Sequence, residues 1–196
     1  KLTAQNIAFN EIARQAIMKD PNWHNGNYLE KGVMPNQGLS LARMLGHITY
    51  LSDESMREKF GRDLKNSKLG FNYDVEFQIE SYLRYQGEKF VTGFDANTYL
   101  LMTKSLDYFD PVKDMADTLI KNLDKCSAKF LIISFTSDWR FPPKRSKEIV
   151  KLLLDNEMDV SYSEISADGG HDAFLMDNKD YFDIMASFIK ESTNGL

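Results

Sequence analysis

The sequence is poor in the residues that mark several protein classes. It contains one cysteine, Cys126, so no internal disulfide can form, and this favours a reducing compartment such as the cytoplasm. No apolar run approaches the roughly 20 residues that a membrane-spanning helix needs. The net charge of −5 comes without a basic stripe, which argues against a nucleic-acid partner. These absences leave an ordinary globular protein with no membrane and no nucleic acid as partners.

Motifs for metals and nucleotides are also missing. There is no C-x-x-C, no H-E-x-x-H and no acidic cluster, so we expect no metal site. G-x-G-x-x-G and G-x-x-x-x-G-K-[ST] are absent too, so we expect no nucleotide cofactor. The chain begins at Lys1 without an initiator methionine or a signal peptide, from which we expect a piece of a longer protein.

Helical patterns fill the first part of the chain. Apolar residues recur at helical spacing, and Asp-Pro pairs and polar, glycine-containing stretches interrupt them. Cap-forming residues such as Asp95 stand where helices should begin. The pattern predicts helices over residues 8–18, 39–51, 75–87 and 95–108, and a short helix around Met56 and Phe60 behind a cap at residues 52–55.

The pattern changes after about Ser127. Residues 129–135 form a continuous apolar run, typical of a strand buried on both faces of a parallel sheet. Three more elements are predicted after this run: a helix opening at Pro142, an alternating strand over 159–165 and a helix over 180–189. This strand–helix–strand–helix order predicts a parallel pair. Two strands do not make a stable open sheet, so further strands should come from sequence outside this chain.

Two chemically informative residues follow these strands. Asp138 comes just after the first strand, and His171 comes after the second, behind Gly169 and Gly170. Taken alone, an acid after a strand often closes a turn, and a loop histidine has no set role. An acid followed by a histidine at successive strand ends is the order found in α/β-hydrolases. The pair therefore indicates two members of a nucleophile–histidine–acid triad.

The third member is absent from this sequence, because no G-x-S-x-G nucleophile elbow occurs. We therefore predict an α/β fold: the C-terminal part of an α/β-hydrolase with an inserted helical lid. Residues 1–27 would join core to lid, 28–112 would form the lid and a dimerisation region, and 113–196 would complete the core. The nucleophile would lie outside the chain, which alone should be inactive.

Seven sequence blocks, distributed over most of the chain, resemble the homoserine O-acyltransferases of methionine biosynthesis, most closely homoserine O-acetyltransferase. Several contiguous blocks in order are more specific than an acid–histidine spacing. The blocks are Ala4–Glu11, Asp20–Trp23, Gly38–Met44, His47–Ser52, Phe94–Leu100, Ser137–Trp139 and Gly170–Leu175.

The resemblance implies a role for five residues. Asp138 would be the triad acid and His171 the triad base. Asp172 would bind the amino group of homoserine, Arg43 its carboxylate, and Tyr50 would add a hydroxyl to that site. From pattern alone, a helical arginine is usually a surface group and a tyrosine beside apolar residues usually packs, so the resemblance carries these two assignments.

Two further histidines have weaker claims. His47 lies one helical turn from Arg43, but no acid or cysteine stands at ligand spacing, so we expect a structural role. His24 follows Trp23 in a predicted loop and should lie at the surface.

The resemblance implies transfer of an acetyl group from acetyl-CoA, a co-substrate rather than a cofactor, to L-homoserine. The reaction would pass through an acyl-enzyme on a serine outside this chain, in a cytoplasmic homodimer. Alternatives remain open: a succinyl donor, serine as acceptor, a plain esterase, or a non-catalytic helical interaction module. Partners would be homoserine, acetyl-CoA and the missing N-terminal half.

Overall fold

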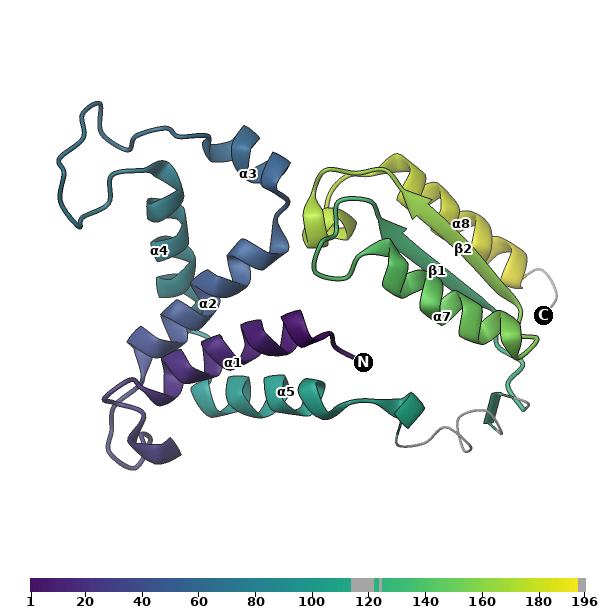
Figure 1. Ribbon diagram of the computed structural model, residues 1–196, viewed down its shortest axis with the longest axis horizontal. Helices are drawn as coiled ribbons and strands as arrows, with labels where there is room; N and C mark the ends of the chain where they lie inside the picture. Colours follow the sequence, from purple (N-terminus) through teal and green to yellow (C-terminus); the bar gives the residue numbers. More distant parts are fainter. Residues whose placement is uncertain (114–121, 124, 194–196) are drawn as a thin grey trace. The chain divides into compact units, whose positions relative to one another are not determined.

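A computed structural model describes residues 1–113, 122–123 and 125–193 (Figure 1). The chain divides into two compact units, and each is described by itself. A helical unit contains residues 1–49 and 57–110, and an α/β unit contains residues 50–56 and 111–196. Residues 50–56 group with the α/β unit. The roles of connector, lid and dimerisation region stay predictions.

Helices make up the first part of the chain, as the apolar spacing predicts. They are α1 (Ala4–Met18), the short 3₁₀ helix η1 (His24–Gly26), α2 (Asn36–Tyr50), α3 (Asp53–Phe60), α4 (Gln78–Val91) and α5 (Ala96–Tyr108). The last residue of α2 and the first half of α3 belong to the α/β unit.

Helix ends are set by caps more than by apolar spacing. Helix α1 begins four residues before the expected residue 8, because the Thr3 hydroxyl accepts a hydrogen bond from the Asn6 backbone N–H at 3.2 Å. Helix α4 begins at Gln78 rather than residue 75 and continues to Val91. The Glu80 carboxylate accepts the backbone N–H of Phe77 at 2.9 Å, which fixes the start of α4.

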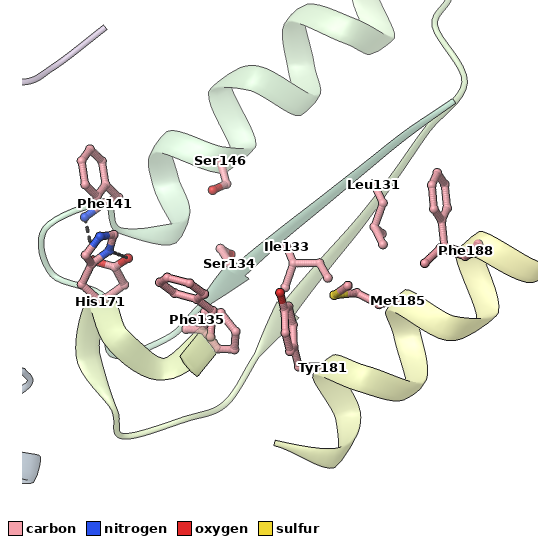
Figure 2. Close-up of a pocket in the computed structure, with 13 residues that line it drawn as sticks. Leu131, Ile133, Ser134, Phe135, Phe141, Ser146, His171, Tyr181, Met185 and Phe188 are labelled. Carbon is pink, nitrogen blue, oxygen red and sulfur yellow. Dashed lines mark hydrogen bonds and ion pairs between the residues drawn. The ribbon is translucent and has the colours of Figure 1, made fainter. Parts of the chain in front are cut away.

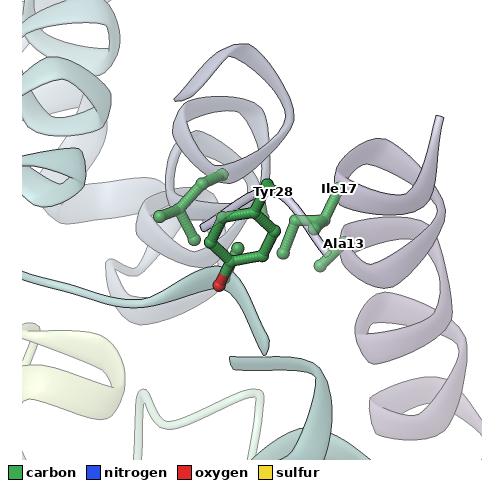
Figure 3. Close-up of a cluster of buried hydrophobic side chains, with 6 residues drawn as sticks. Ala13, Ile17 and Tyr28 are labelled. Atoms are coloured by element: carbon green, nitrogen blue, oxygen red, sulfur yellow. The ribbon is translucent and has the colours of Figure 1, made fainter. Parts of the chain in front are cut away.

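The core of the helical unit surrounds Tyr28, which is fully buried (Figure 3). Ala13 and Ile17 of α1 contact this cluster, which also contains Leu39, Ala42 and Ala96. The Tyr28 hydroxyl donates a hydrogen bond to the Asp95 carboxylate, so the ring can be buried with its polar end paired.

A buried ion pair joins α1 to α5. The Arg14 guanidinium lies 2.7 Å from the Asp107 carboxylate, and both side chains are nearly inaccessible. The Asn10 amide donates to the same carboxylate at 2.8 Å. Sliding one helix along the other would leave a buried charge unpaired, which costs free energy. This network therefore fixes the position of α1 along α5.

The α/β unit is built as predicted from two parallel strands with helices on opposite faces (Figures 1 and 2). Strand β1 (Phe130–Phe135) pairs with β2 (Val160–Ile165) in register from Phe130↔Val160 to Phe135↔Ile165. The helical elements of this unit are α7 (Pro143–Asp155), the 3₁₀ helix η2 (Gly170–Leu175) and α8 (Lys179–Thr193).

The core of this unit is small. Phe135, Ile165 and Ala173 are buried, and Tyr181 and Ile184 of α8 pack against them. Among the described residues, β1 has a strand partner on one edge only. Two strands alone bury little apolar surface, so the expectation that further strands come from outside this chain stays a prediction. No described helix is both long and apolar enough to cross a membrane.

Gly38 allows α2 to approach α1, and replacing it tests that contact. A Cβ at Gly38 would lie 2.4 Å from the Ala16 carbonyl oxygen and 2.7 Å from the Ile17 Cα. Gly38→Ala should therefore lower the free energy of unfolding by about 2 kcal/mol, despite the better helix propensity of alanine. Urea unfolding followed by circular dichroism measures the change.

Gly93→Ala is the matched control, because nothing lies within 4 Å of its Cβ position. It should change the unfolding free energy by no more than about 0.5 kcal/mol. Equal stability of the two variants would show that α1 and α2 are not in close contact at Gly38.

Candidate active site

The parallel strands bring Asp138 and His171 together. Asp138 lies in the loop after β1, and His171 lies in η2, after β2. Nδ1 of His171 lies 2.9 Å from Oδ2 of Asp138, in hydrogen-bonding contact. Because the ends of parallel strands meet at one edge of a sheet, both loops are placed at the same edge.

Asp138 is buried, 8% exposed, and held by several donors. Its Oδ1 accepts the backbone N–H of Phe141 at 2.8 Å. Burial by itself would raise the pKa of Asp138, but hydrogen bonds from His171 and from the backbone of Phe141 and Arg140 outweigh burial and hold the pKa below its ordinary value. The carboxylate is therefore ionised at neutral pH and can orient the imidazole and stabilise its protonated form.

Aromatic rings surround His171. The ring centroids of Phe141, Tyr50 and Phe174 lie 5.1, 5.9 and 6.2 Å from that of His171. With Nδ1 facing the carboxylate, Nε2 is the nitrogen that can exchange a proton with a nucleophile. These three neighbouring rings restrict the orientation of the imidazole.

Residues 50–56 are fastened to the loops that carry this pair. The Trp139 indole N–H donates to the Leu51 carbonyl at 3.0 Å. The hydroxyl groups of Ser52 and Ser55 both donate to the Asp168 carbonyl, the latter at 2.8 Å. Hydrogen bonds from both loops thus hold this segment within the α/β unit.

Gly170 permits the closest of these contacts. Its φ is +70°, and a Cβ there would lie 2.5 Å from the Ser52 backbone nitrogen and 2.7 Å from the Tyr50 carbonyl oxygen. Only glycine fits both the conformation and the approach. The contact places Tyr50 beside His171.

A cavity of about 480 Å³ opens beside the pair (Figure 2). Apolar side chains of β1 and α8 form most of its wall, with His171 at one end. Its lining residues are Leu131, Ile133, Ser134, Phe135, Asp138, Phe141, Ser146, His171, Phe174, Tyr181, Met185, Phe188 and Ile189.

The structure groups three of the five expected site residues, Asp138, His171 and Tyr50, by direct contact. Asp172 follows His171 in η2. Arg43 lies on α2 in the helical unit, with its guanidinium carbon 4.8 Å from the Phe90 ring centroid. The role of Arg43 stays a prediction.

Sequence reasoning missed the anchoring residues Trp139 and Gly170. Both lie inside the blocks that resemble the family, but the sequence pattern gives no sign that they hold residues 50–56 in place.

Among the described residues, no group of three or more potential ligands could hold a metal ion.

The acid and histidine on successive ends of parallel strands, with a helix on each face, define the class. The chain has the C-terminal part of an α/β-hydrolase fold. Solved structures agree: a homoserine O-acetyltransferase from Bacillus anthracis matches with a TM-score of 0.76 at 20% identity, over 89% of this chain and 47% of that one. Esterase E22 matches with a TM-score of 0.71 at 23% identity, over 86% of this chain and 46% of that one.

Sequence comparison points to particular relatives. No family model matches. Homoserine O-succinyltransferase of Hydrogenovibrio crunogenus is 63% identical over 192 residues, covering 97% of this chain and 50% of the relative. The enzyme of the same name from Nitrosomonas europaea is 60% identical over 189 residues, covering 96% and 50%. The chain thus spans about half the length of the curated relatives it matches.

His47 lies in the interior of the helical unit. It is 8% exposed, and its Nδ1 lies 3.2 Å from the Tyr82 hydroxyl. Burial, reinforced by the charges of Arg43 and Lys59, lowers the pKa of His47 to about 4. The imidazole is therefore neutral in the folded protein near pH 7.

This pKa predicts an acid-sensitive helical unit. Because the unfolded chain binds the His47 proton more tightly, folded stability is complete above the ordinary pKa of 6.5 and declines as the pH falls to about 4. The loss should reach about 3 kcal/mol, measured by urea unfolding at successive pH values. His47→Gln should flatten the profile in this range, whereas the exposed control His24→Asn should keep it. An unchanged profile in His47→Gln would contradict this explanation.

Proposed function

We propose that this chain is the C-terminal half of a homoserine O-acyltransferase, with a succinyl thioester as the acyl donor. The observation that carries the proposal is the 59–63% identity, over nearly the whole chain, to relatives named homoserine O-succinyltransferase. The family resemblance favours acetyl-CoA as the donor, with a succinyl donor as an alternative. The names of these relatives favour the alternative, whereas the Bacillus anthracis structure, at 20% identity, bears on the fold alone.

In this proposal His171 moves the proton in both half-reactions. Nε2 would take the proton of a serine outside this chain as the serine attacks the thioester, and would return it to the departing CoA thiolate. Homoserine would then enter, lose its hydroxyl proton to His171 and attack the acyl-enzyme, and the imidazolium would return that proton to the departing serine oxygen. The 2.9 Å contact with Asp138 supports this role, because it stabilises the imidazolium formed in each step.

Homoserine binding is proposed for three residues. The Asp172 carboxylate would pair with the ammonium group, and the Arg43 guanidinium would hold the carboxylate in a two-pronged contact. The ring contact of Tyr50 with His171 supports a place for its hydroxyl beside the reacting atoms. A homoserine acceptor would need both charged contacts, whereas a plain esterase would need neither.

The helical unit is proposed as lid and dimerisation region of a cytoplasmic homodimer. Helix α5 supports this with apolar side chains that are more than half exposed, namely Leu101, Met102, Leu106 and Tyr108. A second subunit would remove them from water.

A hybrid protein tests the proposed activity. This chain replaces the 192 matched residues of the Hydrogenovibrio relative. The rest of the relative then supplies the part that this chain lacks. We expect CoA release that depends on homoserine, with formation of O-acylhomoserine detected by mass spectrometry. Hydrolysis of simple esters without transfer to homoserine would favour an esterase. The 196-residue chain alone should be inactive.

Substitution of the acid–base pair in the hybrid tests the mechanism. Asp138→Asn and His171→Ala should each lower kcat/KM by about 10³-fold or more, since the imidazole loses its orientation or is absent. Asp159→Asn, which replaces an exposed acid just before β2, is the control and should stay within about twofold of the parent. Equal activity of Asp138→Asn and the control would contradict the triad assignment.

A further inference from the structure

The loop before His171 has little conformational restriction of its own. Gly169 and Gly170 stand between Asp168 and the base, and glycine leaves the backbone freer than any other residue. The φ of Gly170 is +70°, a conformation that other residues adopt only with strain. The position of the base therefore depends on the groups that hold the backbone of this loop from outside.

Two hydroxyl groups hold the loop at one point, the backbone carbonyl of Asp168. Ser52 and Ser55 both donate a hydrogen bond to this carbonyl, the latter at 2.8 Å. A carbonyl oxygen has two lone pairs, so it can accept both hydrogen bonds at once. Ser52 is only 6% exposed, which leaves little room for a water molecule to replace its hydroxyl.

Ser52 also fixes the position of the second donor. Its Oγ accepts the backbone N–H of Ser55 at 3.0 Å, and this hydrogen bond caps the first turn of α3, which begins at Asp53. The cap holds Ser55 close to Ser52, so that both hydroxyls face the same carbonyl. The two serine hydroxyls and the Asp168 carbonyl are named the serine clamp.

The clamp binds segments that are far apart in the chain. Ser52 and Ser55 precede Asp168 by 116 and 113 residues. Nearer to the base, the backbone N–H of Gly170 donates to the Ser137 hydroxyl at 2.9 Å. The backbone of the glycine loop is thus held on both sides of Gly169.

The proposed chemistry needs such a restraint. His171 takes up and returns a proton in both half-reactions, so its Nδ1 must stay at 2.9 Å from Oδ2 of Asp138 while Nε2 faces the reacting atoms. A displacement of about 1 Å at the reacting groups costs on the order of 100-fold in rate. Without the clamp, the glycine loop has the freedom to move by that amount.

We propose that Ser52 and Ser55 are positioning residues, which hold the Asp168 carbonyl and thereby keep His171 in place against Asp138. They act through the base and not on the substrates. This inference rests on the proposed acyltransferase function and adds two residues to the support of its acid–base pair.

Serine variants of the hybrid protein test the clamp, with kcat and KM measured for homoserine and for the thioester that the parent prefers. Ser55→Ala removes one donor and should lower kcat about fivefold, whereas the Ser52→Ala, Ser55→Ala double variant removes both and should lower it about 50-fold. Both KM values should stay within about twofold, because the substrate contacts are kept. Ser55→Thr retains a hydroxyl and should keep the kcat of the parent. Ser166→Ala, which removes an exposed hydroxyl of the same loop, is the matched control and should also leave kcat unchanged.

Nitrogen NMR of isotope-labelled histidine measures the position of the base without turnover. The ring signals of His171 are identified by their loss in His171→Ala. In the parent they should report one tautomer, with the proton on Nδ1, because that nitrogen faces the Asp138 carboxylate. In the double variant they should shift toward the average of the two tautomers, and in Ser166→Ala they should not move.

The outcomes separate the clamp from the proposed function. A parent hybrid that folds, by circular dichroism, and transfers no acyl group to homoserine overturns the function, and identical ring signals in the parent and the double variant then overturn the clamp as well. In an active hybrid, a double variant with the kcat of the parent overturns the clamp. A raised KM for homoserine at unchanged kcat does so too, because it places the serines at the substrate.

Loss of folding in the double variant leaves Ser55 to decide, because Ser55 is not the cap of α3. Equal kcat values for Ser55→Ala and Ser55→Thr then overturn the clamp. A kcat that falls in Ser55→Ala and is restored in Ser55→Thr supports it.

Discussion

The hydrogen-bonded ladder between β1 and β2 is the constraint on which the candidate site depends. Parallel pairing carries both strands to the same edge of the sheet, so the loops after Phe135 and Ile165 meet there although helix α7 separates them in sequence. Antiparallel pairing would send those loops to opposite edges. The contact between Asp138 and His171 is thus a consequence of strand direction, and the buried, ionised acid then fixes the histidine.

The same loops also bind residues 50–56 by hydrogen bonds and close packing. Trp139 directly follows the acid and bonds to Leu51, while Gly170 directly precedes the histidine and packs on the backbone of residues 50–52. Each member of the acid–histidine pair therefore lies next to an anchoring residue in the sequence. This arrangement explains how Tyr50 reaches the base, and it places the guanidinium of Arg140 over the same ring.

Elements were predictable where one physical signal dominated. The apolar run before Asp138 gave β1 within one residue, and Pro143 opens α7 as proline does at a first helical turn. Prediction was poorer where side chains compete for backbone donors: Thr3 lengthens α1 toward the N-terminus, and Glu80 delays the start of α4. Apolar spacing reports which face of a helix is buried but carries no information about where the cap forms.

By itself, the sequence determined the parallel strand–helix–strand order, the absence of a nucleophile elbow, and Asp138 and His171 as candidates, because these follow from local pattern and residue chemistry. Only the tertiary structure decided that the two are in contact, that residues 50–56 belong with them, and that Arg140 lies over Tyr50. These are contacts between segments distant in sequence, and they depend on packing distances and backbone approaches, such as that at Gly170, which no local pattern encodes.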